Sequence, residues 1–258
     1  MKMALGVEYD GRAFSGWEIQ KDRETVQGVL EAALSGVADT PIRTICAGRT
    51  DAGVHAWGQV VHFETDRQRP IRAWVLGANS GLPGAVSVSW AKEVPEDFHA
   101  RFSARRRHYR YVLLNRSARC GVLEHRVGWE SRFLNVQVMS AAADRLLGEH
   151  DFSAFRASGC QARTPVRTIH SIDVRRYEQL IFIDVIANAF LKHMVRNVVG
   201  SLVEVGLGKQ PVDWIEFLLS SRERSLGGRT MMPSGLYLLG VEYPHHFEMP
   251  VVVPPTFL

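Results

Sequence analysis

Apolar residues recur along the chain with two periods, and each period predicts one kind of element. Alternation of apolar and polar side chains is typical of a strand, and Tyr109 and Tyr111 alternate in this way within His108–Leu114. Apolar residues three to four positions apart are typical of an amphipathic helix, as in Met139–Leu147. Further strands are predicted over Ala4–Tyr9, Val60–Phe63, Val86–Lys92, Thr168–Arg175, Leu180–Ile186 and Leu236–Tyr243. Further helices are predicted after an N-cap at Thr25, over Ala73–Ala78, over Leu191–Leu202 and from Pro211.

The order of these elements predicts an α+β fold with antiparallel sheets. A turn-sized break, Arg176–Gln179, separates two of the strands and indicates a hairpin. Single helices lie between hairpin-like strands, without the regular strand–helix alternation of a doubly wound parallel sheet. Both halves show a similar order of elements. We therefore expect two similar domains, residues 1–104 and residues 105–258.

Composition places the chain among ordinary globular proteins. Of its 258 residues 46% are hydrophobic and 22% charged, which excludes disordered, collagen-like and coiled-coil chains. No apolar run is long enough for a membrane-spanning helix, and the apolar run at the N-terminus is too short for a signal peptide. The three cysteines are far apart and odd in number, so we expect no disulfide framework. These features predict a soluble, cytoplasmic protein.

Positive charge is concentrated in one part of the chain. The formal net charge is +4, and nine arginines lie between residues 101 and 132, where only Glu124 and Glu130 oppose them. Such a stretch is typical of a protein that binds a polyanion, because guanidinium groups contact phosphates in pairs and stack on bases. A general preference of the chain for arginine over lysine explains the total number equally well, but explains the clustering less well.

The segment Gly48–Ala56 holds the densest set of reactive side chains. Composition alone is compatible with an ordinary turn, in which Thr50 and Asp51 accept from local amides and the glycines supply positive φ. An ordinary turn does not require Arg49 beside the aspartate, nor His55 four residues later. An arginine keeps a nearby carboxylate ionised, as a nucleophile or general base requires. One hypothesis is therefore a hydrolase that uses Asp51 and His55, with or without a metal; another is a non-catalytic RNA-binding protein.

These segments resemble the TruA family of tRNA pseudouridine synthases. Gly48–Ala56 and the following Gly58–Phe63 are similar to the central motif of that family. Glu18 and Lys192 depart from the family pattern, in which a glutamine and an aromatic residue are expected. The resemblance is carried further, in order along the chain, by Glu8–Gly11, Phe14–Trp17, Asn79–Pro83, Phe98–Ala104, His108–Tyr111, Glu149–Arg156, Pro165–Ile169, Phe190–Asn197 and Ser234–Leu238.

The resemblance implies an isomerase that converts uridine to pseudouridine at positions 38, 39 and 40 of tRNA, in the anticodon stem-loop. It also implies the pseudouridine synthase fold, with a basic cleft between two domains, of which the first carries the catalytic aspartate and the second completes the active site. It further implies a homodimer that needs no cofactor and no metal.

Three residues match the family's catalytic positions. Asp51 corresponds to the catalytic aspartate, and the resemblance leaves open whether it attacks C1′ or removes the C2′ proton. Tyr109 corresponds to a tyrosine that stacks on the extruded uracil and helps to remove the C5 proton, whereas its pattern alone is typical of a core residue. Arg196 corresponds to the basic partner of Asp51, whereas periodicity alone puts it on a solvated helix face.

Further residues are expected to hold the RNA. Leu236 matches the apolar residue that packs beneath the base. Arg49 and Arg156 are expected to brace the gap that the nucleotide leaves when it is extruded from the stem. Within the stripe Arg101–Arg110, phosphate contacts are expected from Arg105, Arg106 and Arg107.

Overall fold

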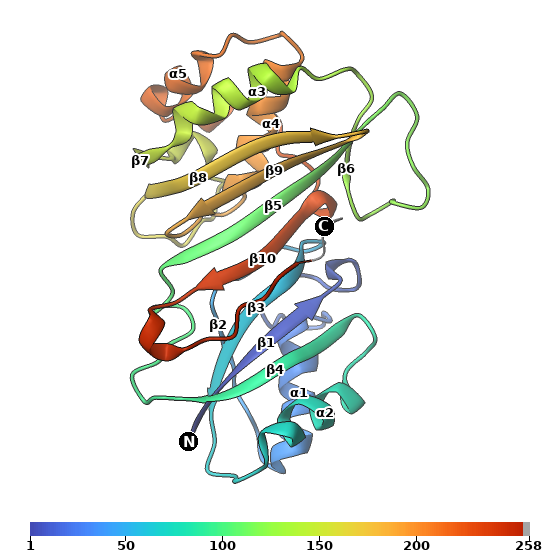
Figure 1. Ribbon diagram of the computed structural model, residues 1–258, viewed down its shortest axis with the longest axis vertical. Coiled ribbons are helices and arrows are strands. Elements are labelled where there is room, and N and C mark those ends of the chain that lie inside the picture. The colour runs from blue at the N-terminus through green and yellow to red at the C-terminus, as the bar shows by residue number, and fades with distance from the viewer. Residues whose placement is uncertain (255–258) are drawn as a thin grey trace. The chain divides into compact units, whose positions relative to one another are not determined.

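The structure is a computed structural model and describes residues 1–254 (Figure 1). By its internal contacts the chain forms two compact units. The first comprises Met1–Arg107 and the segment that starts at Tyr237, and the second comprises His108–Leu236. The chain thus leaves the first unit after Arg107 and returns to it at Tyr237, whereas the sequence prediction placed one boundary between residues 104 and 105.

The first unit combines a sheet with two helices that lie side by side (Figure 1). Its strands follow the order β4-β1-β3-β10, and β2 pairs with β3. Pairing is antiparallel except between β10 and β3, which run parallel with Tyr237 opposite His55. The bounds are β1 (Lys2–Tyr9), α1 (Val26–Ala38), β2 (Ile45–Cys46), β3 (His55–Glu64), α2 (Ile71–Gly81), β4 (Val86–Val94) and β10 (Leu236–Glu242).

Helix α1 begins where the sequence predicts. The hydroxyl of Thr25 accepts a hydrogen bond from the Gly28 N–H at 3.3 Å, so it satisfies a backbone donor that has no partner within the helix. Val26, Leu30 and Leu34 are buried along one face. The apolar period therefore reports the face that packs inward, and the predicted helix is confirmed.

The second unit is built in the same way. Its strands follow the order β5-β9-β8-β7, and β6 pairs with β5 in parallel. Strands β8 and β9 form the predicted antiparallel hairpin, with Val174 opposite Ile183. The bounds are β5 (Arg106–Asn115), β6 (Gly128–Glu130), α3 (Val136–Ala143), β7 (Gly148–Asp151), β8 (Val166–Tyr177), β9 (Leu180–Ala187), α4 (Met194–Gly206) and α5 (Trp214–Ser221).

The predicted α+β class with mostly antiparallel strands is confirmed. Strands β2, β6 and β7 were not predicted, because two to four residues are too few to show a period. Helix α4 starts at Met194 and not at Leu191, since His193 has a left-handed φ of 62°. Short 3-10 helices complete the fold: η1 (Gly11–Ala13), η2 (Asp144–Leu146), η3 (Ser153–Phe155), η4 (Arg224–Leu226), η5 (Pro233–Gly235) and η6 (His245–Phe247).

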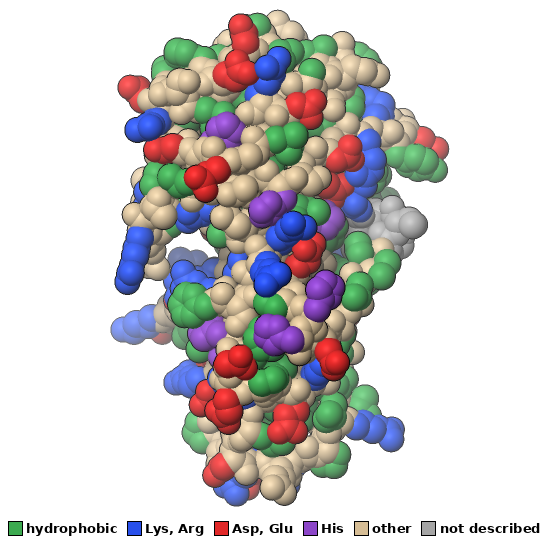
Figure 2. Space-filling view, turned by 60° about the vertical axis from the view of Figure 1, so that its left-hand side comes forward, with side chains coloured by type: hydrophobic (Ala, Val, Ile, Leu, Met, Phe, Trp, Pro, Cys, Tyr) green, Lys and Arg blue, Asp and Glu red, His purple; other side chains and the backbone are tan. Residues whose placement is uncertain are grey.

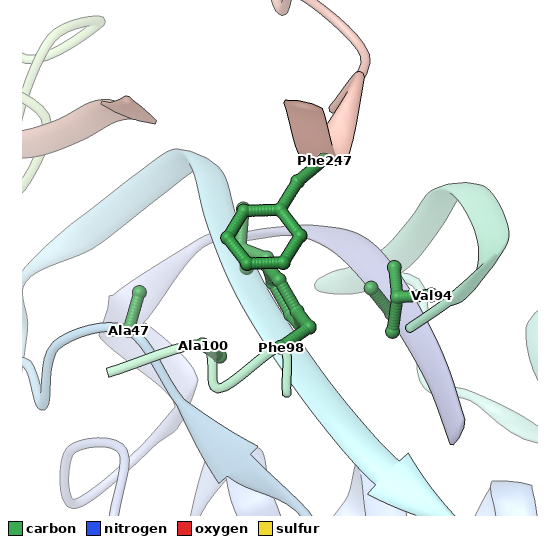
Figure 3. Packing of buried hydrophobic residues seen from close by; sticks show 7 residues of the cluster. Ala47, Val94, Phe98, Ala100 and Phe247 are labelled. Carbon is green, nitrogen blue, oxygen red and sulfur yellow. The ribbon is translucent and has the colours of Figure 1, made fainter. Parts of the chain in front are cut away.

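One hydrophobic cluster of the first unit joins segments far apart in the sequence. Phe98 and Ala100, from the loop after β4, pack with Val94 and with Phe247 near the end of the described chain (Figure 3). The rings of Phe98 and Phe247 lie edge to face, with centroids 5.1 Å apart. Within residues 1–254, no helix is long and apolar enough to cross a membrane.

Candidate functional site

The predicted catalytic aspartate lies in the loop between β2 and β3. The Val54 N–H donates to the Asp51 carbonyl at 3.1 Å, and Gly53 adopts a φ of 78°, so the chain turns sharply just after Asp51. The Asp51 side chain is half-buried. A second turn supports this loop, since the Trp17 N–H donates to the Thr50 carbonyl at 3.0 Å. The loop thus has a defined backbone conformation.

Polar contacts with other segments of the first unit hold the loop that carries Asp51. The Thr50 hydroxyl lies 2.8 Å from the Tyr9 hydroxyl, and the Gln59 amide donates to the Gly48 carbonyl at 2.6 Å. Gly16 approaches the loop so closely that a Cβ there would lie 3.0 Å from the Thr50 carbonyl oxygen. A buried polar atom without a partner would be costly, so these contacts resist displacement of the loop.

His55, at the start of β3, is packed into the first unit. Its Nδ1 accepts from the Gly11 N–H at 3.1 Å, and its ring stacks on Tyr237 with centroids 4.7 Å apart. The Asp10 carboxylate lies 3.3 Å from the same nitrogen and also binds Arg12. Burial raises the pKa of Asp10, but the hydrogen bonds from Arg12 outweigh it, so this pKa lies below its ordinary value. This setting favours a structural role for His55 over the general base of the hydrolase hypothesis.

Arg49 is held at the surface by an acidic neighbour. Its Nη2 lies 2.5 Å from Glu18 Oε1, and both side chains are about half exposed. Glu18 is one of the two residues that depart from the family pattern. An exposed pair of this kind contributes about 0–1 kcal/mol, so the ion pair can open at little cost.

Tyr109 lies on β5 and is 8% exposed. Its ring packs edge to face against Phe190, with centroids 4.9 Å apart. Leu236, at the start of β10, is also buried.

Arg196 lies in the first turn of α4 and is fixed by the segment that follows η4. Its Nε donates to the Met231 carbonyl at 2.7 Å, and the Met231 N–H donates back to the Arg196 carbonyl at 3.2 Å. The next residue, Met232, accepts from the Tyr111 hydroxyl of β5 at 2.9 Å. One short segment therefore binds both the helix of Arg196 and the strand of Tyr109.

The polar face of α4 is covered. Asn197 is fully buried, and its side-chain oxygen accepts from the Thr230 hydroxyl at 2.6 Å and from Arg224 at 3.0 Å. A Cβ at Gly200 would lie 1.8 Å from the Arg229 carbonyl oxygen, so the loop rests directly on the helix. Periodicity alone predicted a solvated face here, and that interpretation is wrong. The polar side chains are present because they bind this loop.

Arg156 organises the loop that follows η3. Its Nη2 donates to the carbonyls of Cys160 and Ala162 at 2.8 and 2.9 Å. The Lys192 N–H donates to the Cys160 sulfur at 3.4 Å, so the same loop also contacts the chain just before α4. The predicted role of Arg156 in bracing the RNA stays a prediction, and any such contact must form alongside these bonds.

The arginine stripe divides into exposed and buried members. Arg105 and Arg106 are exposed, and Arg106 lies 3.6 Å from Glu242. Arg107 is 8% exposed, and its guanidinium donates to the carbonyls of Ala47 at 3.0 Å and Arg101 at 2.7 Å. The guanidinium donors are thus used by hydrogen bonds within the first unit. Arg107 is therefore not among the residues proposed to bind RNA.

Arg110 is likewise engaged within its unit. Its Nε and the Nε2 of His108 each lie 2.8 Å from Asp184 Oδ1. Burial raises the pKa of Asp184, but the hydrogen bonds from His108 and Arg110 outweigh it and lower the pKa to about 2. On the face shown in Figure 2, Lys and Arg side chains are interspersed with Asp and Glu and form no unbroken band. Arg110 is thus bound within its own unit, whereas Arg105 and Arg106 are exposed.

The comparisons with known proteins decide the family. The family described as tRNA pseudouridine synthase matches residues 6–103 and 142–244. This chain belongs to the tRNA pseudouridine synthase family. It is 53% identical to tRNA pseudouridine synthase A of Pseudoalteromonas atlantica, over all of this chain and 98% of that protein. Proteins of the same name from Klebsiella pneumoniae and Coxiella burnetii are 53% and 50% identical over all of this chain and 96% and 99% of their own lengths.

Family membership confirms the resemblance and the enzyme class that it implied. The chain is a pseudouridine synthase, an isomerase of tRNA modification. The individual roles of Asp51, Tyr109 and Arg196 stay predictions. Within residues 1–254, no group of three or more His, Cys, Asp or Glu side chains is placed to hold a metal ion.

Sequence reasoning missed the supporting role of some residues. Asn197 and Arg107 are the clearest cases, because both bind backbone carbonyls of loops. A polar pair between apolar residues, Arg196 and Asn197 between Val195 and Val198, was the available signal. The sequence alone does not say which loop such a residue binds.

Proposed function

We propose that this protein converts uridine to pseudouridine at positions 38, 39 and 40 of tRNA, in the anticodon stem-loop. The observation that carries the proposal is identity of about half of all residues, over the full chain, to proteins named tRNA pseudouridine synthase A. In the reaction the bond between N1 and C1′ breaks, the uracil turns, and a bond forms between C5 and C1′. N1 gains a proton and C5 loses one, so the conversion consumes no oxidant or reductant.

Asp51 is the proposed catalytic residue. The sharp turn at Gly53 and the buried contacts of Thr50 and Gly48 support this role, because they hold the backbone of Asp51 in one conformation. A carboxylate positioned in advance avoids part of the entropic cost of reaching the sugar. Attack on C1′ and removal of the C2′ proton both require it to be ionised.

Tyr109, Arg196 and Leu236 are proposed to act on the same nucleotide. The aromatic packing of Tyr109 on Phe190 fixes the plane of its ring, as stacking on the extruded uracil requires. The bond from Arg196 Nε to Met231 fixes the direction of its guanidinium, which we propose as the partner of the Asp51 carboxylate. Leu236 supplies an apolar surface beneath the base.

The extruded nucleotide leaves a gap in the stem, and arginines are proposed to fill it and to hold the backbone. Arg49 is suited to this role because its pair with Glu18 is exposed and weak. Arg156 is proposed to brace the stem from its ordered loop, and Arg105 and Arg106 to bind phosphates. A basic cleft between two domains is part of the same proposal.

We further propose that the enzyme acts as a homodimer in the cytoplasm, without cofactor or metal. All three cysteines are unpaired thiols, which agrees with a reducing compartment. Sedimentation of the purified protein, alone and with tRNA, tests the dimer. An assay with and without a chelator tests the independence from metal.

The proposed function is tested by incubating the protein with a tRNA transcript and mapping pseudouridine. Wild type should form it at positions 38 to 40. Asp51→Asn removes the charge with little change in shape, so it should bind tRNA and form no detectable pseudouridine. Asp66→Asn, which changes an exposed aspartate of the same unit, is the matched control and should keep full activity. A folded Asp51→Asn protein with a rate near wild type would show that the assignment is wrong.

A further inference from the structure

The loop between β4 and β5 presents a large apolar side chain to solvent. Phe102 is 75% exposed, whereas Phe98, four residues earlier, is fully buried. We propose that Phe102 is a stacking platform for an unpaired base of the tRNA, with Arg101 as its cationic neighbour. The proposal rests on the proposed function for the identity of the RNA, and it adds a binding residue that the catalytic site does not include.

The residues just before Phe102 anchor this loop to the rest of the first unit. Phe98 and Ala100 lie in the hydrophobic cluster of Figure 3. The Ala100 N–H donates to His62 Nδ1 at 3.1 Å, and the Ala100 carbonyl accepts from the Tyr243 hydroxyl at 2.7 Å. Both backbone groups of this residue are therefore satisfied by side chains from other elements, which ties the base of the loop to the sheet and to the C-terminal segment.

Hydrogen bonds also hold the tip of the loop, residues 99–103, in place. His99 Nδ1 accepts from the N–H groups of Arg101 and Phe102, each at 3.2 Å. The Ser103 hydroxyl accepts from the His99 N–H at 3.0 Å, and the Ser103 N–H donates to the His99 carbonyl at 2.9 Å. Arg107 then binds the Arg101 carbonyl at 2.7 Å. The exposure of Phe102 thus belongs to an ordered turn.

The ring already has stacking partners on the protein side. The His99 ring lies 4.3 Å from the Phe102 ring between centroids, at an angle of 31°, and the Arg101 guanidinium lies 5.6 Å from the same centroid. A base placed on the open part of the ring would extend this stack. Every base has a flat π-face, so such a platform accepts any base and adds affinity without reading sequence.

The charge around the ring favours RNA over a protein partner. Arg101, Arg105 and Arg106 are all exposed within five residues of Phe102, and a nucleotide offers a flat base and a phosphate within one unit. A protein partner of ordinary size would need a wide apolar surface around the ring, and here the Arg101 guanidinium lies over the ring. An ordered aromatic side chain among arginines is the arrangement that single-stranded nucleic acid binds.

The experiment compares Phe102→Ala, Phe102→Leu and Phe102→Trp by the Kd for a full-length tRNA transcript. Phe102→Ala should raise Kd about 5- to 150-fold, the factor that loss of one base–aromatic stack produces. Phe102→Leu should remain weak, because it keeps apolar surface without a π-face, and Phe102→Trp should restore binding. The ratio of variant to wild-type Kd should stay constant between low and high salt, because stacking releases no counterions.

Two controls separate this proposal from its alternatives. Phe217→Ala removes an exposed ring of α5 in the second unit and should leave Kd unchanged. Sedimentation of Phe102→Ala should match wild type; dissociation of an assembly would mean that the ring contacts a second copy, and would overturn the proposal. Equal binding by the Ala, Leu and Trp variants would overturn it too. The proposed function fails separately, if wild type forms no pseudouridine, whereas the Kd comparison does not depend on turnover.

Discussion

Asp184 offers the sharpest test of how the second unit holds Tyr109 in place. The side chain of Asp184 is 11% exposed on β9 and binds His108 and Arg110, the two residues that flank Tyr109 on β5. It also binds Arg175 of β8 at 2.6 Å. Asp184→Asn keeps the shape and removes the charge at the centre of this cluster. The variant leaves cationic side chains without their shared carboxylate.

The expected loss of folding stability follows from the lowered pKa of Asp184. Hydrogen bonds and charges lower the pKa of Asp184 from 3.8 to about 2, against the opposing effect of burial. A shift of this size corresponds to about 2.5 kcal/mol of folding stability at neutral pH. Because the folded pKa lies below the unfolded one, this contribution is present above about pH 4 and is lost as pH falls through about 2. About half of it should remain at pH 3.

Denaturant unfolding of wild type and Asp184→Asn from pH 7 to pH 3 measures this contribution. The variant should lose about 2–3 kcal/mol at pH 7, and the difference should shrink by about half at pH 3. Asp173→Asn is the matched control: Asp173 lies opposite Asp184 in the β8–β9 register and also binds Arg175, but its side chain is 54% exposed. It should change stability by about 0.5 kcal/mol or less. If the loss of stability in Asp184→Asn is the same at pH 7 and pH 3, the charge of Asp184 is not its source.

Three further predictions concern the loop, the RNA and the chemistry. Gly16→Ala should lower stability by about 1–2 kcal/mol and reduce pseudouridine formation, because Gly16 has a φ of 99° and its Cβ would press on the loop that carries Asp51. Gly36→Ala, in an open helical position, should be neutral or stabilising in thermal unfolding of the same kind. The double variant Arg105→Ala with Arg106→Ala should flatten the slope of log Kd for tRNA against log salt by about 1.5, and an unchanged slope would remove both from the RNA surface. Tyr109→Phe should bind tRNA almost normally and form pseudouridine about 100-fold more slowly or worse, measured in single turnover; a loss of only a few-fold would exclude proton transfer by the hydroxyl.

Elements with a long, regular pattern of apolar residues could be predicted from the local sequence. Helix α1 follows from its apolar period and the Thr25 cap, and the β8–β9 hairpin follows from two apolar runs with a turn-sized break. The resemblance that named the family depends on the Gly48–Ala56 motif and on segments that follow it in order, which need no structure to recognise. These features can be recognised from sequence because each depends on residues that are close together in the chain.

Residues with the same local sequence pattern differ in their contacts once the chain is folded. Arg105, Arg106 and Arg107 are consecutive and chemically identical, yet two are exposed and the third is buried and binds the carbonyl of Ala47. Likewise the polar side chains of α4 are typical of a solvated face, but a loop from about 30 residues later covers them through Asn197. A pattern of polar and apolar residues reports the polarity of each position. Which distant carbonyl or loop satisfies a polar side chain depends on contacts between segments that the local sequence does not encode.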